Sequence, residues 1–121
     1  MAQNNLLARF EKVLEKHELK YERYDDKIIV LWSDEESGRR FMNVFWKIGD
    51  RMVVDMITDI DPNIPEDVAL RAVNIANLNA IGTFIAVAKC ANRRVLIARA
   101  LSPRILCEED LEDVLRIAEA E

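Results

Sequence analysis

The chain has 121 residues, of which half are apolar and about a third are charged, and its net charge is −5. These values predict one folded domain over residues 1–121 and exclude an intrinsically disordered chain, which lacks the apolar residues that build a core. The acidic balance also disfavours nucleic-acid binding, which usually depends on a concentrated basic surface.

The sequence gives no sign of membrane insertion or secretion. Its longest apolar runs hold about five residues, whereas a bilayer-spanning helix needs ~20. The first residues are polar and do not resemble a signal peptide. We therefore expect a cytoplasmic protein without membrane contact. Cys90 and Cys107 fit no metal-site spacing and are interpreted as small buried or half-buried thiols, with one disulfide bond as the alternative.

Hydrophobic periodicity predicts the elements in chain order. A first helix is indicated by apolar residues at helical spacing (Leu6, Leu7, Phe10, Val13, Leu14). Three strands are predicted at residues 27–33, 40–48 and 51–58, a second helix at about 65–79, two strands at 82–89 and 94–101, and a third helix at 108–120. The order α-β-β-β-α-β-β-α predicts an α+β fold in which one antiparallel-rich, five-stranded sheet carries helices on one face.

Alternation within the strands divides the predicted sheet into two faces. We assign a uniformly apolar set to the helix-covered core: Met42, Val44, Trp46, Met52, Val54, Met56, Phe84, Ala86, Ala88, Leu96, Ala98 and Ala100. The second set mixes apolar residues with single charges: Phe41, Asn43, Phe45, Lys47, Val53, Asp55, Ile57, Thr83, Ile85, Val87, Lys89, Val95, Ile97 and Arg99.

A mixed face of this size predicts a covering partner, because monomers rarely leave large apolar patches in water. The candidates are a second copy, another protein or a ligand. The alternative is that the first helix or the 59–65 connector folds over it. Asp55 and Arg99 are mid-strand charges that pair with each other or with a partner. The predicted partner-binding residues are Phe41, Phe45, Asp55, Ile85, Val87 and Arg99.

The second helix is apolar most of the way round, which is typical of a helix packed on two sides. One side faces its own sheet, and the same helix of a second copy is the candidate for the other side. The predicted dimer interface consists of Leu70, Val73, Asn74 and Asn77.

No catalytic, metal or cofactor site is predicted. The stretch 59–63 begins like a calcium-binding loop, but Ile64 and Leu70 occupy positions where that loop needs glycine and glutamate. The single histidine, His17, has no ligand-spaced neighbours, and the glycines are isolated. We therefore expect no enzymatic activity.

The element order, the aromatic pair Phe45-Trp46 and the asparagine-bearing stretch VNIANLN at 73–79 resemble the YbjN-like family, proposed bacterial sensory-transduction regulators. Their fold is similar to that of type III secretion chaperones. The resemblance implies a homodimer that binds a protein or peptide segment, acting as a chaperone-like or regulatory adaptor module. The alternative function is a small-ligand-sensing regulatory domain, whose pocket between helices and sheet would be lined by Met42, Met52 and Met56.

Overall fold

The computed structural model describes residues 2–33, 36, 38, 40–80 and 83–120 of the chain. The elements follow one another in the order α1 (Ala2–Lys16), β1 (Glu22–Arg23), β2 (Lys27–Ser33), β3 (Arg40–Ile48), β4 (Arg51–Asp59), α2 (Glu66–Asn79), β5 (Thr83–Cys90), β6 (Arg93–Arg104) and α3 (Glu108–Ala120). The predicted α+β class and element order are confirmed. The described sheet has six strands instead of five, because β1 is too short to give an alternating pattern.

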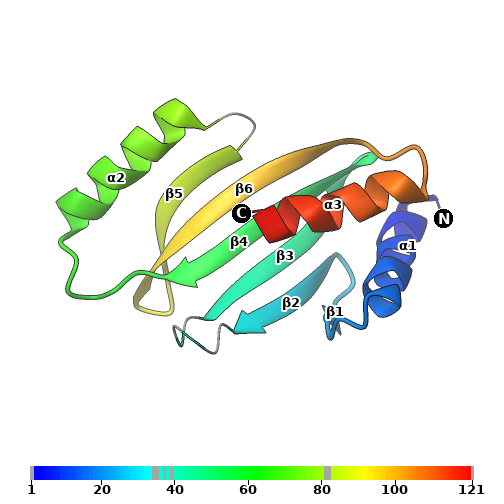
Figure 1. Cartoon of the computed structure of the whole chain (residues 1–121), viewed down its shortest axis with the longest axis horizontal. Coiled ribbons are helices and arrows are strands. Elements are labelled where there is room, and N and C mark those ends of the chain that lie inside the picture. The colour runs from blue at the N-terminus through cyan, green and yellow to red at the C-terminus, as the bar shows by residue number, and fades with distance from the viewer. Residues whose placement is uncertain (1, 34–35, 37, 39, 81–82, 121) are drawn as a thin grey trace.

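All neighbouring strands of the sheet are antiparallel, in the order β1-β2-β3-β4-β6-β5. Two-residue turns connect β3 to β4 and β5 to β6. Gly49 adopts a positive φ in the first turn, and Ala91 and Asn92 both do so in the second, as a twisted type I′ hairpin requires. Helices α1 and α3 pack on one face of the sheet, whereas α2 lies along its edge beside β5 (Figure 1).

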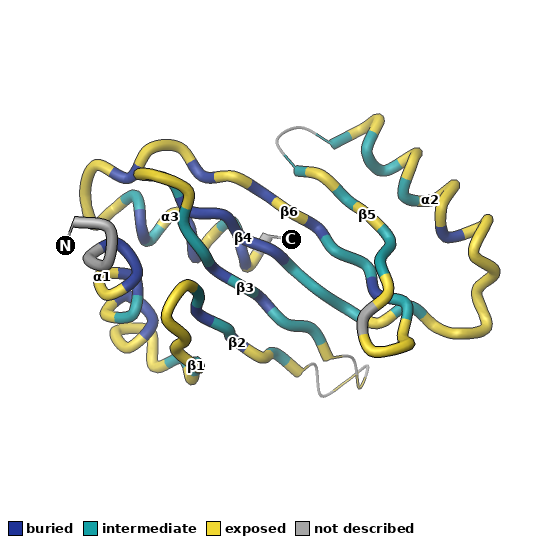
Figure 2. Tube along the Cα trace, turned by 180° about the vertical axis from the view of Figure 1, so that it is seen from behind, coloured by how far each residue is buried: buried dark blue, intermediate teal, exposed yellow. Residues whose placement is uncertain are grey.

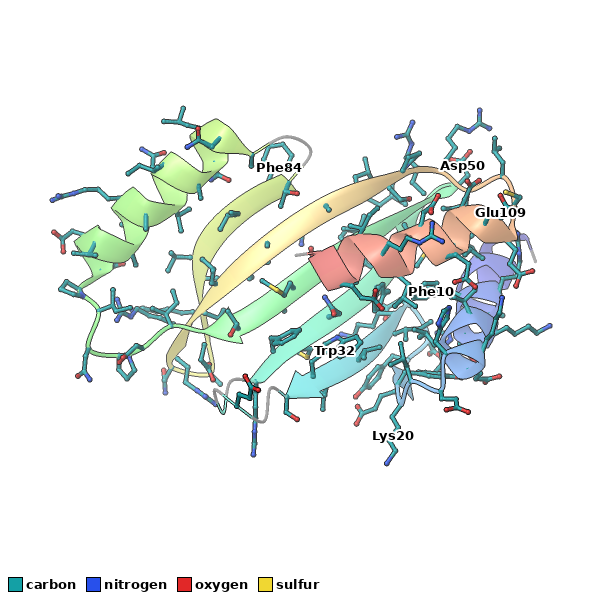
Figure 3. The ribbon with its side chains drawn as sticks, viewed as in Figure 1. Phe10, Lys20, Trp32, Asp50, Phe84 and Glu109 are labelled. Atoms are coloured by element: carbon teal, nitrogen blue, oxygen red, sulfur yellow. The ribbon has the colours of Figure 1, made fainter. Side chains whose placement is uncertain are left out.

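The core lies where α1 and α3 meet one end of the sheet. It contains the apolar stripes of both helices together with side chains from β2, β3 and β4. The ring of Phe10 on α1 lies 4.7 Å from that of Phe45 on β3, and neither ring is exposed to solvent. Figure 3 labels Phe10 at the place where the two helices converge on the sheet. This packing anchors α1 and α3 and leaves α2 outside the main core.

Charged contacts connect the end of α1 to α3. His17 Nε2 lies 2.7 Å from Glu112 Oε2, and Lys16 Nζ lies 3.4 Å from Glu112 Oε1. The hydrogen bond with His17, followed by that with Lys16, lowers the pKa of the Glu112 carboxyl. His17 is thus part of a contact between α1 and α3.

The last strand extends further than predicted. The predicted strand covers residues 94–101, whereas β6 continues to Arg104 through a bulge opposite Met52. The backbone N–H of Met52 donates to Ser102 Oγ at 2.9 Å, and the same hydroxyl donates to the Pro103 carbonyl at 2.8 Å. The serine side chain therefore accepts a backbone donor at the bulge, and pairing resumes beyond the proline.

Candidate protein-binding surface

The register of the hairpins determines which side chains share a face. Directly opposite residues of antiparallel strands project to the same side. β3 and β4 place Val44 opposite Asp55, and β6 places Arg99 opposite both Asp55 and Phe84. These residues lie on the face opposite α1 and α3, which Figure 2 views from the front. We call it the open face. Its members are Glu22, Lys27, Ile29, Leu31, Ser33, Arg40, Met42, Val44, Trp46, Ile48, Arg51, Val53, Asp55, Ile57, Asp59, Phe84, Ala86, Ala88, Arg93, Val95, Ile97, Arg99, Leu101 and Arg104.

The predicted division into faces is correct for β4 and β6 and wrong for β3 and β5. A two-residue turn pairs residues whose numbers have an odd sum, such as Ile48 with Arg51 and Cys90 with Arg93. Even-numbered residues of β4 therefore share a face with odd-numbered residues of β3. As a result Phe45 belongs to the core, while Trp46 and Phe84 belong to the open face.

A polar cluster of Trp46, Asp55 and Arg99 lies in the middle of the open face. Arg99 donates from Nε to Asp55 Oδ1 at 2.7 Å and from Nη2 to Asp55 Oδ2 at 3.0 Å. The indole N–H of Trp46 donates to Asp55 Oδ2 at 3.1 Å, and the guanidinium carbon lies 5.3 Å from the centre of the indole ring. The Asp55 side chain is 8% exposed, whereas that of Arg99 is 52% exposed. The hydrogen bonds with Asp55 raise the pKa of Arg99, so the guanidinium stays charged.

Exposed apolar side chains flank this cluster. Phe84, directly opposite Arg99, is 76% exposed, and Leu31 and Leu101 are also exposed. Figure 3 shows Phe84 at the α2 end of the sheet, far from Phe10. The open face thus combines an oriented cation with apolar groups, a composition found at protein interfaces.

The charges of the open face are unevenly matched. Two of its carboxylates are in ion pairs, Asp55 with Arg99 and Asp59 with Arg93. The third among the described residues, Glu22 opposite Ile29, accepts a hydrogen bond from the Tyr24 hydroxyl. Among the described residues, Lys27 and Arg51 on the same face have no carboxylate partner. On the opposite side of the molecule, α3 has the sequence EEDLEDVLRIAEA, with one arginine and six acids. The chain is acidic as a whole, yet its open face carries excess positive charge.

Helix α2 presents a second apolar surface. The side nearest β5 is made of small or half-buried residues, among them Ala69, Val73 and Ala76. Away from β5, apolar side chains are exposed, with Ile75 at 61% and Leu78 at 82%. We call Val68, Leu70, Ile75 and Leu78 the outer surface of α2.

One side chain attaches α2 to the edge of the sheet. The Asn77 amide donates from Nδ2 to the Ile85 carbonyl and accepts from the Ile85 N–H at Oδ1, both at 2.8 Å. It therefore pairs with β5 as the backbone of a neighbouring strand would. This contact holds α2 beside the strand without a large shared core.

We predict that Asn77→Ala lowers the free energy of unfolding by about 1–3 kcal/mol, because it removes two hydrogen bonds from a half-buried amide. Amide exchange at Ile85 should rise by about tenfold or more, because its N–H loses its acceptor. Urea unfolding and hydrogen–deuterium exchange measure the two effects. The control is Asn79→Ala, since the Asn79 amide bonds only to Ile75 of its own helix. Unchanged exchange at Ile85 in Asn77→Ala would contradict the proposed attachment.

The arrangement of elements is similar to that of a solved protein. The chain aligns over 94% of its length with the crystal structure of YbjN from E. coli, a proposed transcription regulator, and covers 83% of that chain, with a TM-score of 0.70. The chain has a YbjN-like fold. The sequence identity is 11%, so the similarity concerns the fold alone. No protein-family model matches the sequence, and no curated protein matches it.

The YbjN-like fold distributes the predicted partner-binding residues over two faces. Asp55 and Arg99 come together on the open face. Phe41, Ile85 and Val87 project to the helix side and are half-buried, and Phe45 is fully buried there. Phe45 is therefore inaccessible to a partner in the folded chain. Trp46 and Phe84 take the aromatic positions on the open face, a placement that the sequence prediction missed.

The predicted dimer residues are also divided. Leu70 and Asn74 are exposed on α2, whereas Val73 and Asn77 are half-buried on the side that approaches β5. Asn77 binds Ile85, a residue assigned to the partner surface, so the structure joins two residues expected at separate interfaces.

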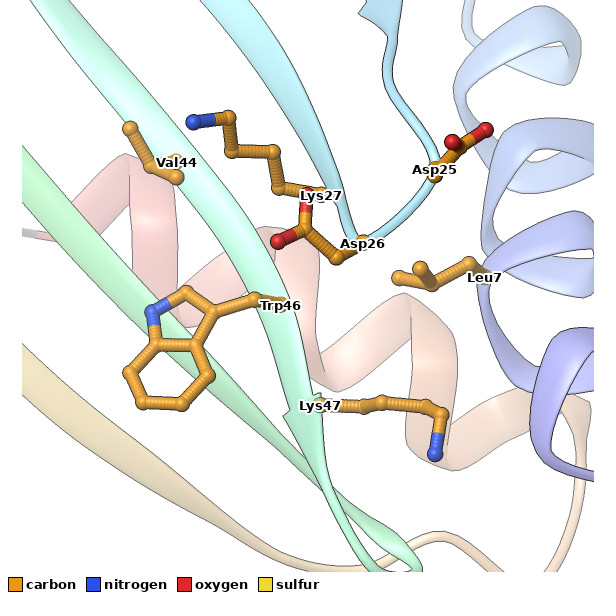
Figure 4. A pocket seen from close by; sticks show the side chains of 7 residues that line it. All are labelled: Leu7, Asp25, Asp26, Lys27, Val44, Trp46 and Lys47. Carbon is orange, nitrogen blue, oxygen red and sulfur yellow. The ribbon is translucent and has the colours of Figure 1, made fainter.

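Two of the hollows beside the sheet bear on the predicted ligand pocket. One, of about 470 Å³, lies at the α1 end and is lined by Leu7, Asp25, Asp26, Lys27, Val44, Trp46 and Lys47. Figure 4 shows Trp46 and Lys47, neighbours on β3, pointing in different directions. The other, of about 610 Å³, lies at the opposite ends of β3 and β4 and includes Met42. Met52 is buried beneath the helices and Met56 shares its face, so the three methionines do not line one pocket as predicted.

The described residues contain no cluster of three or more His, Cys, Asp or Glu side chains that would suit a metal ion. Cys107 is an exposed free thiol, contrary to the predicted burial, and the Cys90 side chain lies outside the described residues. Within the part of the chain that the structure describes, no helix has the length and apolar character needed to cross a membrane.

Proposed function

We propose that this chain is a non-enzymatic protein-binding module that acts as a homodimer, with α2 at the dimer interface and the open face as the partner surface. The observation that carries the proposal is the exposure of Ile75 and Leu78 on a helix that contacts its own fold mainly through β5. Exposed apolar patches of this kind mark association sites on folded proteins. Placing α2 against its copy in a second chain would remove these side chains from water.

A regulatory role fits the same arrangement. The YbjN protein of similar fold is described as a proposed transcription regulator. We extend to this chain a role as a regulatory adaptor that acts through protein contacts. We do not extend it to direct nucleic-acid binding, because the net charge is −5.

The dimer is tested by sedimentation velocity. The wild-type chain is expected to sediment at twice the 14.0 kDa mass of one chain, and Leu78→Asp at the mass of one chain, because a buried carboxylate at an apolar interface is unfavourable. The matched control is Leu106→Asp, since Leu106 is similarly exposed but lies outside α2 and should leave the dimer intact. A monomeric wild-type chain, or a Leu78→Asp dimer as stable as the wild type, would refute the role of α2.

A further inference from the structure

We propose that the open face binds an apolar segment of another protein and that Arg99 recognises an aspartate or glutamate side chain within that segment. The inference rests on the proposed protein-binding function and adds the chemistry by which the partner is selected.

Arg99 is oriented by Asp55 and keeps hydrogen-bond donors free for a ligand. Asp55 is buried and receives three hydrogen bonds, two from Arg99 and one from Trp46. A guanidinium has five N–H donors, so two of the five point to Asp55 and three remain. Because half of the Arg99 side chain is exposed, these donors are accessible from the open face. Asp55 therefore orients a cation that has unused hydrogen-bonding capacity.

The charge of the open face favours an acidic ligand. On the open face Asp55 and Asp59 are engaged in ion pairs and Glu22 accepts from the Tyr24 hydroxyl. Lys27 and Arg51 add positive charge without a carboxylate partner among the described residues. An incoming acid would meet an excess of cations and would accept charge-assisted hydrogen bonds from Arg99. A basic segment would meet like charge on the same face.

Exposed apolar side chains surround Arg99. Phe84 lies directly across the strand pair from Arg99 and is largely exposed, and Leu101 is exposed on the same strand as Arg99. Apolar side chains on both sides of an acid would cover these residues and exclude water from the Arg99–carboxylate contact, which strengthens it.

The experiment is selection from a phage-displayed random dodecapeptide library in which no peptide has a free C-terminus. The intact protein is the bait. The expected result is enrichment of peptides with Asp or Glu between apolar residues. For such a peptide, replacing the acid by its amide should weaken binding to the wild type by about tenfold or more, as measured by fluorescence polarisation. Phe84→Ser should weaken binding of the acidic peptide.

The discriminating variant is Asp55→Asn with Arg99→Gln, which removes both charges together and leaves no buried charge without a partner. This variant should bind the acidic peptide and its amide counterpart within about twofold of each other. Its fold is checked by circular dichroism. The control Lys47→Gln removes a cation from the other face of β3 and should keep the tenfold discrimination.

Each remaining outcome decides against the inference. Enriched peptides that lack acids but still depend on Phe84 would overturn the role of Arg99 and leave the protein-binding function intact. Failure to enrich any peptide would overturn both. If Phe84→Asp separates the wild-type dimer in sedimentation velocity, a second copy occupies the open face and the peptide proposal is wrong.

Discussion

Replacing Phe45 with alanine is expected to lower the free energy of unfolding by about 3–5 kcal/mol, the usual cost of truncating a buried phenylalanine. The Phe45 ring is fully buried and packs 4.7 Å from that of Phe10, at the point where α1 meets the sheet. Removal of the Phe45 ring opens a cavity between α1 and the sheet, which the surrounding side chains fill only in part. Urea unfolding followed by tryptophan fluorescence measures the loss.

The matched control for this prediction is Phe84→Ala. Both residues are phenylalanines on strands of the same sheet, but Phe84 is 76% exposed. Its truncation should change stability by no more than about 0.5 kcal/mol. Equal losses in the two variants would mean that the assignment of Phe45 to the core and of Phe84 to the open face is wrong.

Replacing Arg99 with methionine is expected to destabilise the chain by about 2–3 kcal/mol, because the buried Asp55 carboxylate loses its ion-pair partner and two of its three hydrogen bonds. The loss of stability should not exceed this value, because the Arg99 side chain is half-exposed and its truncation lets water solvate the Asp55 carboxylate. Chemical denaturation measures it.

The double variant Asp55→Asn with Arg99→Met tests the mechanism of this loss. Removing the charge of Asp55 as well should restore at least half of the lost stability, because a neutral amide is less costly to bury than a carboxylate. If the double variant is no more stable than Arg99→Met, an unpaired carboxylate is not the cause. Some other loss of packing at Arg99 would then account for the effect.

The sequence predicts the elements well because each carries a clear local signal. Strands β2 and β3 and helix α3 have the predicted bounds, and β4, α2, β5 and β6 differ by one to three residues at an end. β1 was missed because two residues show no periodicity. α2 was expected on the sheet face, yet its small inner residues and Asn77 place it along the edge beside β5.

The faces of β3 and β5 were harder to predict because both sets of alternating residues are apolar. Asn43 and Asp55 were assigned to one face as polar interruptions. In the structure Asn43 lies on the core side, where its Oδ1 accepts from the indole N–H of Trp32 at 2.5 Å, and Asp55 lies on the other. The length of the turn Gly49-Asp50 determines which residues of β3 and β4 share a face. Two residues between strands fix the register, and that register alone places Asp55 beside Trp46.

The contact between Asn77 and Ile85 has a consequence for self-assembly into fibrils. β5 is the last strand of the sheet on its side, and its outward backbone groups are the place where a foreign strand would begin to pair. The Asn77 amide already occupies the N–H and carbonyl of Ile85. A strand from another molecule would have to displace α2 before the sheet could grow there. The two hydrogen bonds of Asn77 therefore protect this edge from amyloid-like extension.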